Sequence, residues 1–123
     1  MKTAIIILSD PSGGEDALGR VFNGLAVAYD YMQHGDEVTL LFQGAGTRWI
    51  GELSKPDHPV HGLFDVVKAS VAGVSRGCAD VFGATEEVGN SAFEFVTGNA
   101  VPGTSGLSSL RKLASEGYSI LCF

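Results

Sequence analysis

The stretch that decides the fold begins with TAIIILS at residues 3–9, where three consecutive isoleucines and a leucine are typical of a strand buried on both faces. EVTLLFQ at residues 37–43 is a second buried strand of the same kind. A strand, a helix and a strand within roughly 40 residues predict a βαβ unit with parallel strands. The helix between them is predicted by apolar residues at spacings of three and four: Leu18, Val21, Phe22, Leu25, Ala26, Tyr29 and Met32.

The rest of the chain continues the alternation of strands and helices. Ser12, with Glu15 three residues later, predicts a capping box at the start of the first helix. We therefore expect residues 1–123 to form one α/β domain, a three-layer α/β/α sandwich with a mostly parallel sheet of about five strands. The further predicted elements are helices at 48–53, 60–71, 77–82 and 104–116 and strands at 74–76, 93–97 and 118–123.

The composition excludes several classes of partner. Of 123 residues, 45% are hydrophobic and 18% are charged, as in a globular protein. The 8 basic and 14 acidic residues give a formal charge of −6, and the basic residues are scattered, so neither nucleic acid nor an anionic membrane is an expected partner. The apolar runs are too short to span a bilayer, and no secretory signal follows Lys2, so a cytoplasmic location is expected.

The chain has two cysteines, Cys78 and Cys122, without a CxxC spacing. In a reducing cytosol this pair favours neither a structural disulfide nor a zinc site. Cys122 falls in the last predicted strand, between Leu121 and Phe123, and is expected to be a buried, inert thiol.

Cys78 is the best candidate for chemistry. In open parallel sheets, ligands bind outside the carboxyl ends of the strands, and Cys78 follows a short predicted strand. It also lies near the start of a predicted helix, where free amides and the helix dipole favour a thiolate. Arg76 adds positive charge nearby, and Gly77 and Ala79 flank the thiol. The alternative is that Cys78 is a small buried hydrophobe, as free cysteines often are.

Other residues are expected at the same rim as supporting or ligand-binding groups. Gly44, Gly46 and Arg48 follow the second strand in a loop that only loosely resembles an anion site, because the chain has neither GxxxxGK[ST] nor GxGxxG after the first strand. Trp49 either stacks on a ligand or packs beneath this loop. His61, near the start of the third helix, either reaches the same rim or has a surface or helix-start role, and the second is the favoured interpretation. No cofactor is expected.

Five features follow one another along the whole chain. They are the hydrophobic strand at 4–8, the helix around 18–32, the strand at 38–42, the VSRGCA segment at 74–79 and the closing EGYSI at 116–120. This arrangement resembles the DsrE/DsrF-like (YchN-like) family of small sulfur-relay proteins.

The resemblance implies a five-stranded parallel sheet, homo- or hetero-oligomers that are often trimers or hexamers, and relay of sulfur between donor and acceptor proteins as a cysteine persulfide. Cys78 matches the position of the relay cysteine, a role that needs an exposed thiol with a lowered pKa. Arg76 and Gly77 directly before the cysteine, and the histidine-containing segment 58–61, depart from the family's relay motifs.

The leading hypothesis is a sulfur carrier or sulfurtransferase-like protein that uses Cys78. The alternative is a non-catalytic oligomeric module that binds a small ligand or a protein at the rim, with Cys78 incidental. The rate of alkylation against pH separates the two. A metal site built from Cys78, His58 and His61 is a third and weaker hypothesis. Aromatic residues available for subunit contacts are Phe93, Phe95, Tyr118 and Phe123.

Overall fold

The computed structural model describes residues 1–123 and contains a five-stranded sheet in which every neighbouring pair of strands is parallel. The order across the sheet is β4-β3-β2-β1-β5, so the first strand lies inside and the last lies at an edge. The predicted α/β class and parallel sheet are confirmed. The strands are β1 (Lys2–Ile7), β2 (Glu37–Phe42), β3 (Val71–Ser75), β4 (Phe95–Val96) and β5 (Ser119–Cys122).

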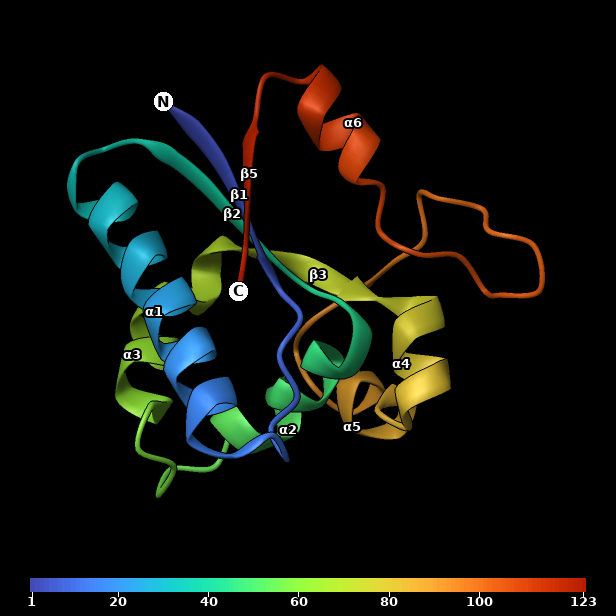
Figure 1. The fold of residues 1–123 in the computed structure, drawn as a ribbon, viewed down its shortest axis with the longest axis horizontal. Coiled ribbons are helices and arrows are strands. Elements are labelled where there is room, and N and C mark those ends of the chain that lie inside the picture. The colour runs from blue at the N-terminus through green and yellow to red at the C-terminus, as the bar shows by residue number, and fades with distance from the viewer.

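Helices cover the two faces of this sheet unequally. Helices α1 and α3 lie together on one face, α6 lies on the other, and α4 and α5 lie beyond the carboxyl end of β3 (Figure 1). None of the helices, α1 included, combines the length and apolar character that crossing a membrane requires. The helices are α1 (Gly14–Gln33), α2 (Trp49–Leu53), α3 (His61–Val67), α4 (Arg76–Phe82), α5 (Thr85–Gly89) and α6 (Leu110–Ser115), with 3-10 turns η1 (Gly44–Arg48) and η2 (Lys68–Ser70).

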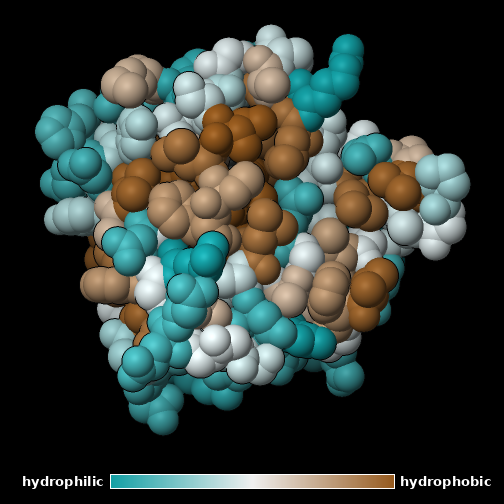
Figure 2. All heavy atoms as spheres, in the orientation of Figure 1, coloured by the Kyte–Doolittle hydropathy of each residue, from teal (hydrophilic) through white to brown (hydrophobic).

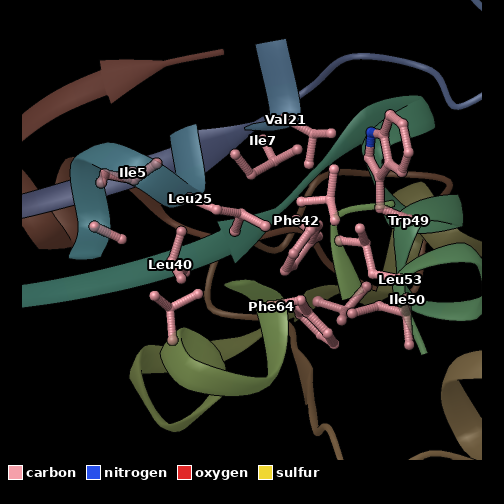
Figure 3. Packing of buried hydrophobic residues seen from close by; sticks show 14 of the residues in the cluster. Ile5, Ile7, Val21, Leu25, Leu40, Phe42, Trp49, Ile50, Leu53 and Phe64 are labelled. Carbon is pink, nitrogen blue, oxygen red and sulfur yellow. The ribbon is translucent and has the colours of Figure 1, made fainter. Parts of the chain in front are cut away.

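The main core lies between the sheet and α1 and α3. Alternate side chains of β1, Ile5 and Ile7, point into it and meet Leu25 of α1 and Phe42 of β2 (Figure 3). Phe42 also packs edge to face against Phe64 of α3, with ring centroids 6.4 Å apart. Strands with apolar residues on both faces are what a sheet covered by helices on both sides requires.

The opposite face of the sheet has a thinner cover. Its hydrophobic cluster contains only three buried residues, Ala4, Ile6 and Leu41, beneath the partly buried Leu110 and Leu113 of α6. A helix of 6 residues cannot cover five strands, so part of this face is left to the segment that precedes α6.

That segment corrects the helix predicted at 104–116, because only Leu110–Ser115 is helical. Residues 97–109 form a loop instead, in which Asn99 and Leu107 pair through two backbone hydrogen bonds of 2.8 Å. Gly106 has φ +100, a conformation that glycine adopts freely and that a helix does not allow. We call this segment the 97–109 loop.

Other predicted boundaries are also corrected. The helix predicted at 60–71 ends at Val67, and Val71 begins β3. The strands predicted at 93–97 and 118–123 shorten to Phe95–Val96 and Ser119–Cys122. The capping box is wrong: α1 begins after Gly13 without a side-chain cap, since the Ser12 amide donates to Asp10 Oδ1 in a local turn.

Candidate functional site

The carboxyl ends of the parallel strands meet at one edge, and Cys78 lies there in the first turn of α4, directly after β3. η1, which follows β2, packs against α4. The structure therefore brings together the segments Gly44–Arg48 and Arg76–Phe82, which contain most of the candidate residues from the sequence.

The thiol of Cys78 lies in a small buried polar cluster. The residue is 8% exposed. The hydroxyl of Ser75 donates a hydrogen bond to Cys78 Sγ at 3.1 Å, and Ser75 Oγ accepts one from the Ser108 amide at 3.3 Å. Ser75 is fully buried on the α6 face of the sheet, so the thiol also faces that side. The relay role calls for an exposed thiol, but in this conformation the thiol is buried.

The 97–109 loop covers the start of α4. The Gly77 amide donates to Gly106 O at 2.8 Å, and Ser105 Oγ donates to Asp80 Oδ2 at 2.5 Å. The hydrogen bonds from Ser105 and Thr85 lower the pKa of the Asp80 carboxyl, so these contacts favour its charged form. Access to Cys78 is therefore governed by how this loop docks on α4.

Replacement of Gly77 with alanine tests this cover. A methyl group there would lie 2.6 Å from Leu107 Cδ1 and 3.1 Å from Gly106 O, so the loop must move away. A loss of about 1.4 kcal/mol in docking free energy would raise the rate of Cys78 alkylation about tenfold. The rate is measured by mass spectrometry of the peptide that contains Cys78, which separates it from Cys122.

Gly98→Ala is the matched control for Gly77→Ala. A methyl group on Gly98 in the same loop would meet only Ser109 Cβ, at an ordinary 3.5 Å. This variant should leave the alkylation rate unchanged. An unchanged rate in Gly77→Ala as well would show that the loop does not limit access to the thiol.

The residues around Cys78 have mainly structural contacts. The guanidinium of Arg76 lies over the Phe95 ring, 5.4 Å from its centroid, and makes no hydrogen bond with the thiol. Ala79 is fully buried in the main core. Gly77 is where the loop approaches the helix backbone.

The Gly44–Arg48 turn is also tightly fixed. A methyl group on Gly46 would lie 2.2 Å from Ile7 O, so only glycine fits against the end of β1. Arg48 donates from Nε to Phe82 O at 2.8 Å and from Nη1 to Asp10 Oδ2 at 3.1 Å. These contacts join the loop after β1 to the end of α4. The pKa of Asp10 is lowered mainly by its hydrogen bonds with Ser12, and the ion pair with Arg48 adds to this effect.

Of the two alternatives for Trp49, stacking on a ligand or packing beneath the loop, the structure shows the second. Trp49 is 2% exposed, and its Nε1 donates to Ser9 O at 2.8 Å. Figure 3 shows its ring among the core side chains of Ile7 and Val21.

His61 does not join Cys78. Its Nδ1 is 2.7 Å from Leu53 O, and the ring lines a separate cavity of about 600 Å³ with Phe64, Lys68 and Phe93. No group of three or more histidine, cysteine, aspartate or glutamate side chains is positioned to hold a metal ion.

Cys122 is exposed, which corrects the buried thiol expected from its apolar neighbours. It lies on the edge strand β5 and pairs with Ile6 of β1. The α6 face is thinly covered, so nothing shields this side chain from solvent.

Sequence reasoning missed Ser75 and Ser108, the two serines whose hydrogen bonds lead to the thiol. Ser75 ends β3 three residues before Cys78, a spacing that places its hydroxyl at the first turn of the following helix. Ser108 gave no such signal, because a helix was predicted at its position and its contact with Ser75 spans 33 residues.

Comparison with known proteins agrees with this fold. The model of the DsrE/DsrF-like family matches residues 1–123. An uncharacterized protein of Methanocaldococcus jannaschii, MJ0733, is 28% identical over 88 residues, which cover 72% of this chain and 72% of that protein. No solved structure matches the chain.

Proposed function

Because the chain belongs to the DsrE/DsrF-like family, we propose that it carries sulfur as a persulfide on Cys78 and passes it to a partner. Membership of this family suggests a sulfur-relay role in general. The observation that supports Cys78 as the carrier is its place in the first turn of α4, with the Ser75 hydroxyl donating to its sulfur. Hydrogen-bond donors, the Ser75 hydroxyl among them, therefore lie beside a sulfur at the carboxyl edge of the sheet.

Loading and unloading are thiol exchanges without net oxidation or reduction. The Cys78 thiolate attacks the outer sulfur of a donor persulfide, whose S–S bond breaks so that the donor leaves as a thiolate. The acceptor thiolate then attacks the outer sulfur on Cys78, which is released again as a thiolate. One sulfur atom moves in each cycle.

The other residues at this edge serve as a frame in this proposal. Gly77 and Ala79 hold the first turn of α4 close to the loop and the core. Gly44, Gly46, Arg48 and Trp49 fix the neighbouring turn, while Arg76 packs on β4. Because Cys78 is 8% exposed, the 97–109 loop must shift before a donor reaches the sulfur.

Intact mass after exposure to inorganic polysulfide tests the proposal. The reduced protein should gain one sulfur atom that dithiothreitol removes, and peptide mapping should find it on Cys78. A gain on the exposed Cys122 alone, or no gain at all, would contradict the proposed carrier role.

The burial of Cys78 favours a second candidate, a non-catalytic module that binds a small ligand or a protein at the same edge. In that case Cys78 would react with iodoacetamide slowly at neutral pH, even in the Gly77→Ala variant. The carrier role instead requires fast alkylation once the loop is displaced.

We also propose that the chain forms a homo-oligomer, a trimer or hexamer in keeping with its resemblance to the family. Hydrophobic side chains gather on the molecular surface where β5 forms the edge of the sheet (Figures 1 and 2). Leu121 is 38% exposed there, and the outer edge of β5 has no partner strand. Such edges pair readily with another chain.

Leu121→Lys should therefore shift the protein to a smaller species in light scattering coupled to size-exclusion chromatography. Val66→Lys is the matched control, since Val66 is 52% exposed on α3, away from β5. Equal molar masses for the two variants would exclude the β5 edge as the subunit contact.

A further inference from the structure

A cavity of about 390 Å³ lies on the α6 face of the sheet, and we call it the α6 cavity. Its apolar walls include Leu41 of β2, Val96 of β4 and Leu113 of α6. Thr97 and Ser108 of the 97–109 loop also line it, so the segment that covers Cys78 forms one of its walls. Neither the family match nor the relative assigns a role to this space.

The inner part of the α6 cavity contains a hydroxyl that lacks a partner. Ser108 is 4% exposed, and its Oγ has no hydrogen-bond partner. A buried hydroxyl left unpaired costs free energy, and a ligand in the cavity could restore the missing bond. The Ser108 amide donates to Ser75 Oγ, which in turn donates to Cys78 Sγ, so this end of the cavity is two hydrogen bonds from the thiol.

The outer part carries opposite charges. Lys112 and Glu116 both line the α6 cavity and are exposed, and the structure pairs neither side chain with an ion. They are four residues apart, Lys112 within α6 and Glu116 at its C-terminal cap, so the helix places an ammonium and a carboxylate on the same side of the cavity. A ligand with a carboxylate for Lys112 and an ammonium for Glu116 would satisfy both.

We propose that the α6 cavity binds a small amino-acid thiol of the cysteine class, as the free thiol or its persulfide. Its charged end lies between Lys112 and Glu116, and its sulfur end lies toward Ser108 and Cys78. The inference rests on the proposed carrier function, for which it names a small-molecule donor or acceptor of sulfur. Cys78 does not itself line the cavity, so loading needs the shift of the 97–109 loop described above. Cys78 then attacks the outer sulfur of the ligand persulfide, and the ligand departs as the free thiolate.

Three thiols separate the contributions of the two charges. Cysteine carries both groups, cysteamine lacks the carboxylate, and 3-mercaptopropionate lacks the amine. In an anaerobic NMR titration of the full chain, cysteine should bind most tightly and shift the amide signals of Thr97, Ser108 and Lys112. Equal affinity for the three thiols, or no shift at these amides, would overturn the proposed site.

Variants of Lys112 and Glu116 test which charged group of the ligand each side chain binds. Lys112→Gln should weaken cysteine and 3-mercaptopropionate about two- to fivefold but leave cysteamine unchanged, as expected for an exposed ion pair. Glu116→Gln should weaken cysteine and cysteamine only. Arg111→Gln removes the same charge one residue away, from a side chain that does not line the cavity, and should change nothing. The same loss in Arg111→Gln would indicate a general charge effect and would overturn the site.

Transfer from cysteine persulfide distinguishes failure of the site from failure of the carrier role. Thr39→Phe places a ring in the α6 cavity and should slow loading of Cys78 by cysteine persulfide, while loading by inorganic polysulfide continues. Equal loading rates with and without the ring would overturn the cavity as the entry site but keep the carrier role. Cysteine binding without any loading of Cys78, from either donor, would overturn the carrier role and leave the cavity as a thiol-binding site.

Discussion

Replacement of Cys78 with serine is expected to abolish the gain of sulfur completely, because a hydroxyl cannot form a persulfide. The substitution is mild for the fold. The side chain is small, and Ser75 Oγ remains beside it as a hydrogen-bond partner. Unfolding in urea should show a loss of no more than about 1 kcal/mol, as is common for single substitutions. The native protein and the variant are compared by intact mass after the same polysulfide treatment.

Cys122→Ser is the matched control, since it removes the other thiol of the chain. Cys122 is the more exposed of the two thiols and therefore the one that an unselective reagent meets first. Full loading in Cys122→Ser together with none in Cys78→Ser would assign the carrier to the buried position. The reverse pattern would show surface reaction at Cys122 and would end the relay proposal.

Gly46→Ala is expected to destabilise the protein by more than about 3 kcal/mol, at the upper end of what overpacking costs. The added methyl would lie 2.2 Å from Ile7 O, 2.8 Å from Ile7 C and 3.2 Å from Leu8 Cα. All three atoms are backbone at the end of β1, a central strand, so no side-chain rotation relieves the clash. The midpoint of thermal unfolding should fall by about 10 °C.

Gly19→Ala in α1 provides the comparison for Gly46→Ala. A methyl group there would have no atom within 4 Å, and alanine favours a helix over glycine by up to about 1 kcal/mol. This variant should be as stable as the native protein or more so. A similar small effect in Gly46→Ala would show that the turn after β2 is not packed against β1 as described.

The architecture was predictable because its signal is local. The isoleucines of β1 and the apolar stripe of α1 are each read within one element, and they fix a βαβ unit whose strands are parallel. The helix predicted at 104–116 is wrong over its first part, because Gly106 adopts a positive φ and Leu107 pairs with Asn99. Such pairing between residues of a loop has no periodic signature in the sequence.

The candidate site was predictable in position but not in exposure. Cys78 follows β3 at the expected edge of the sheet, because the carboxyl ends of parallel strands meet there. Its burial depends on contacts made by Gly106 and Ser108, which lie about 30 residues further along the chain. His61 lies apart from Cys78 because its Nδ1 contacts Leu53 O and its ring lines a separate cavity. The residue type alone does not reveal such a backbone contact.

The hydrogen bonds that run from Ser108 through Ser75 to Cys78 have a thermodynamic consequence. Ser75 Oγ accepts from the Ser108 amide and donates its one proton to the sulfur, so a hydroxyl that turns away from the sulfur also changes the geometry of its bond with Ser108. Occupancy of the α6 cavity and the chemical state of Cys78 are then linked equilibria, and linkage is reciprocal. If conversion of the thiol to a persulfide weakens ligand affinity by some factor, the ligand destabilises the persulfide by that same factor.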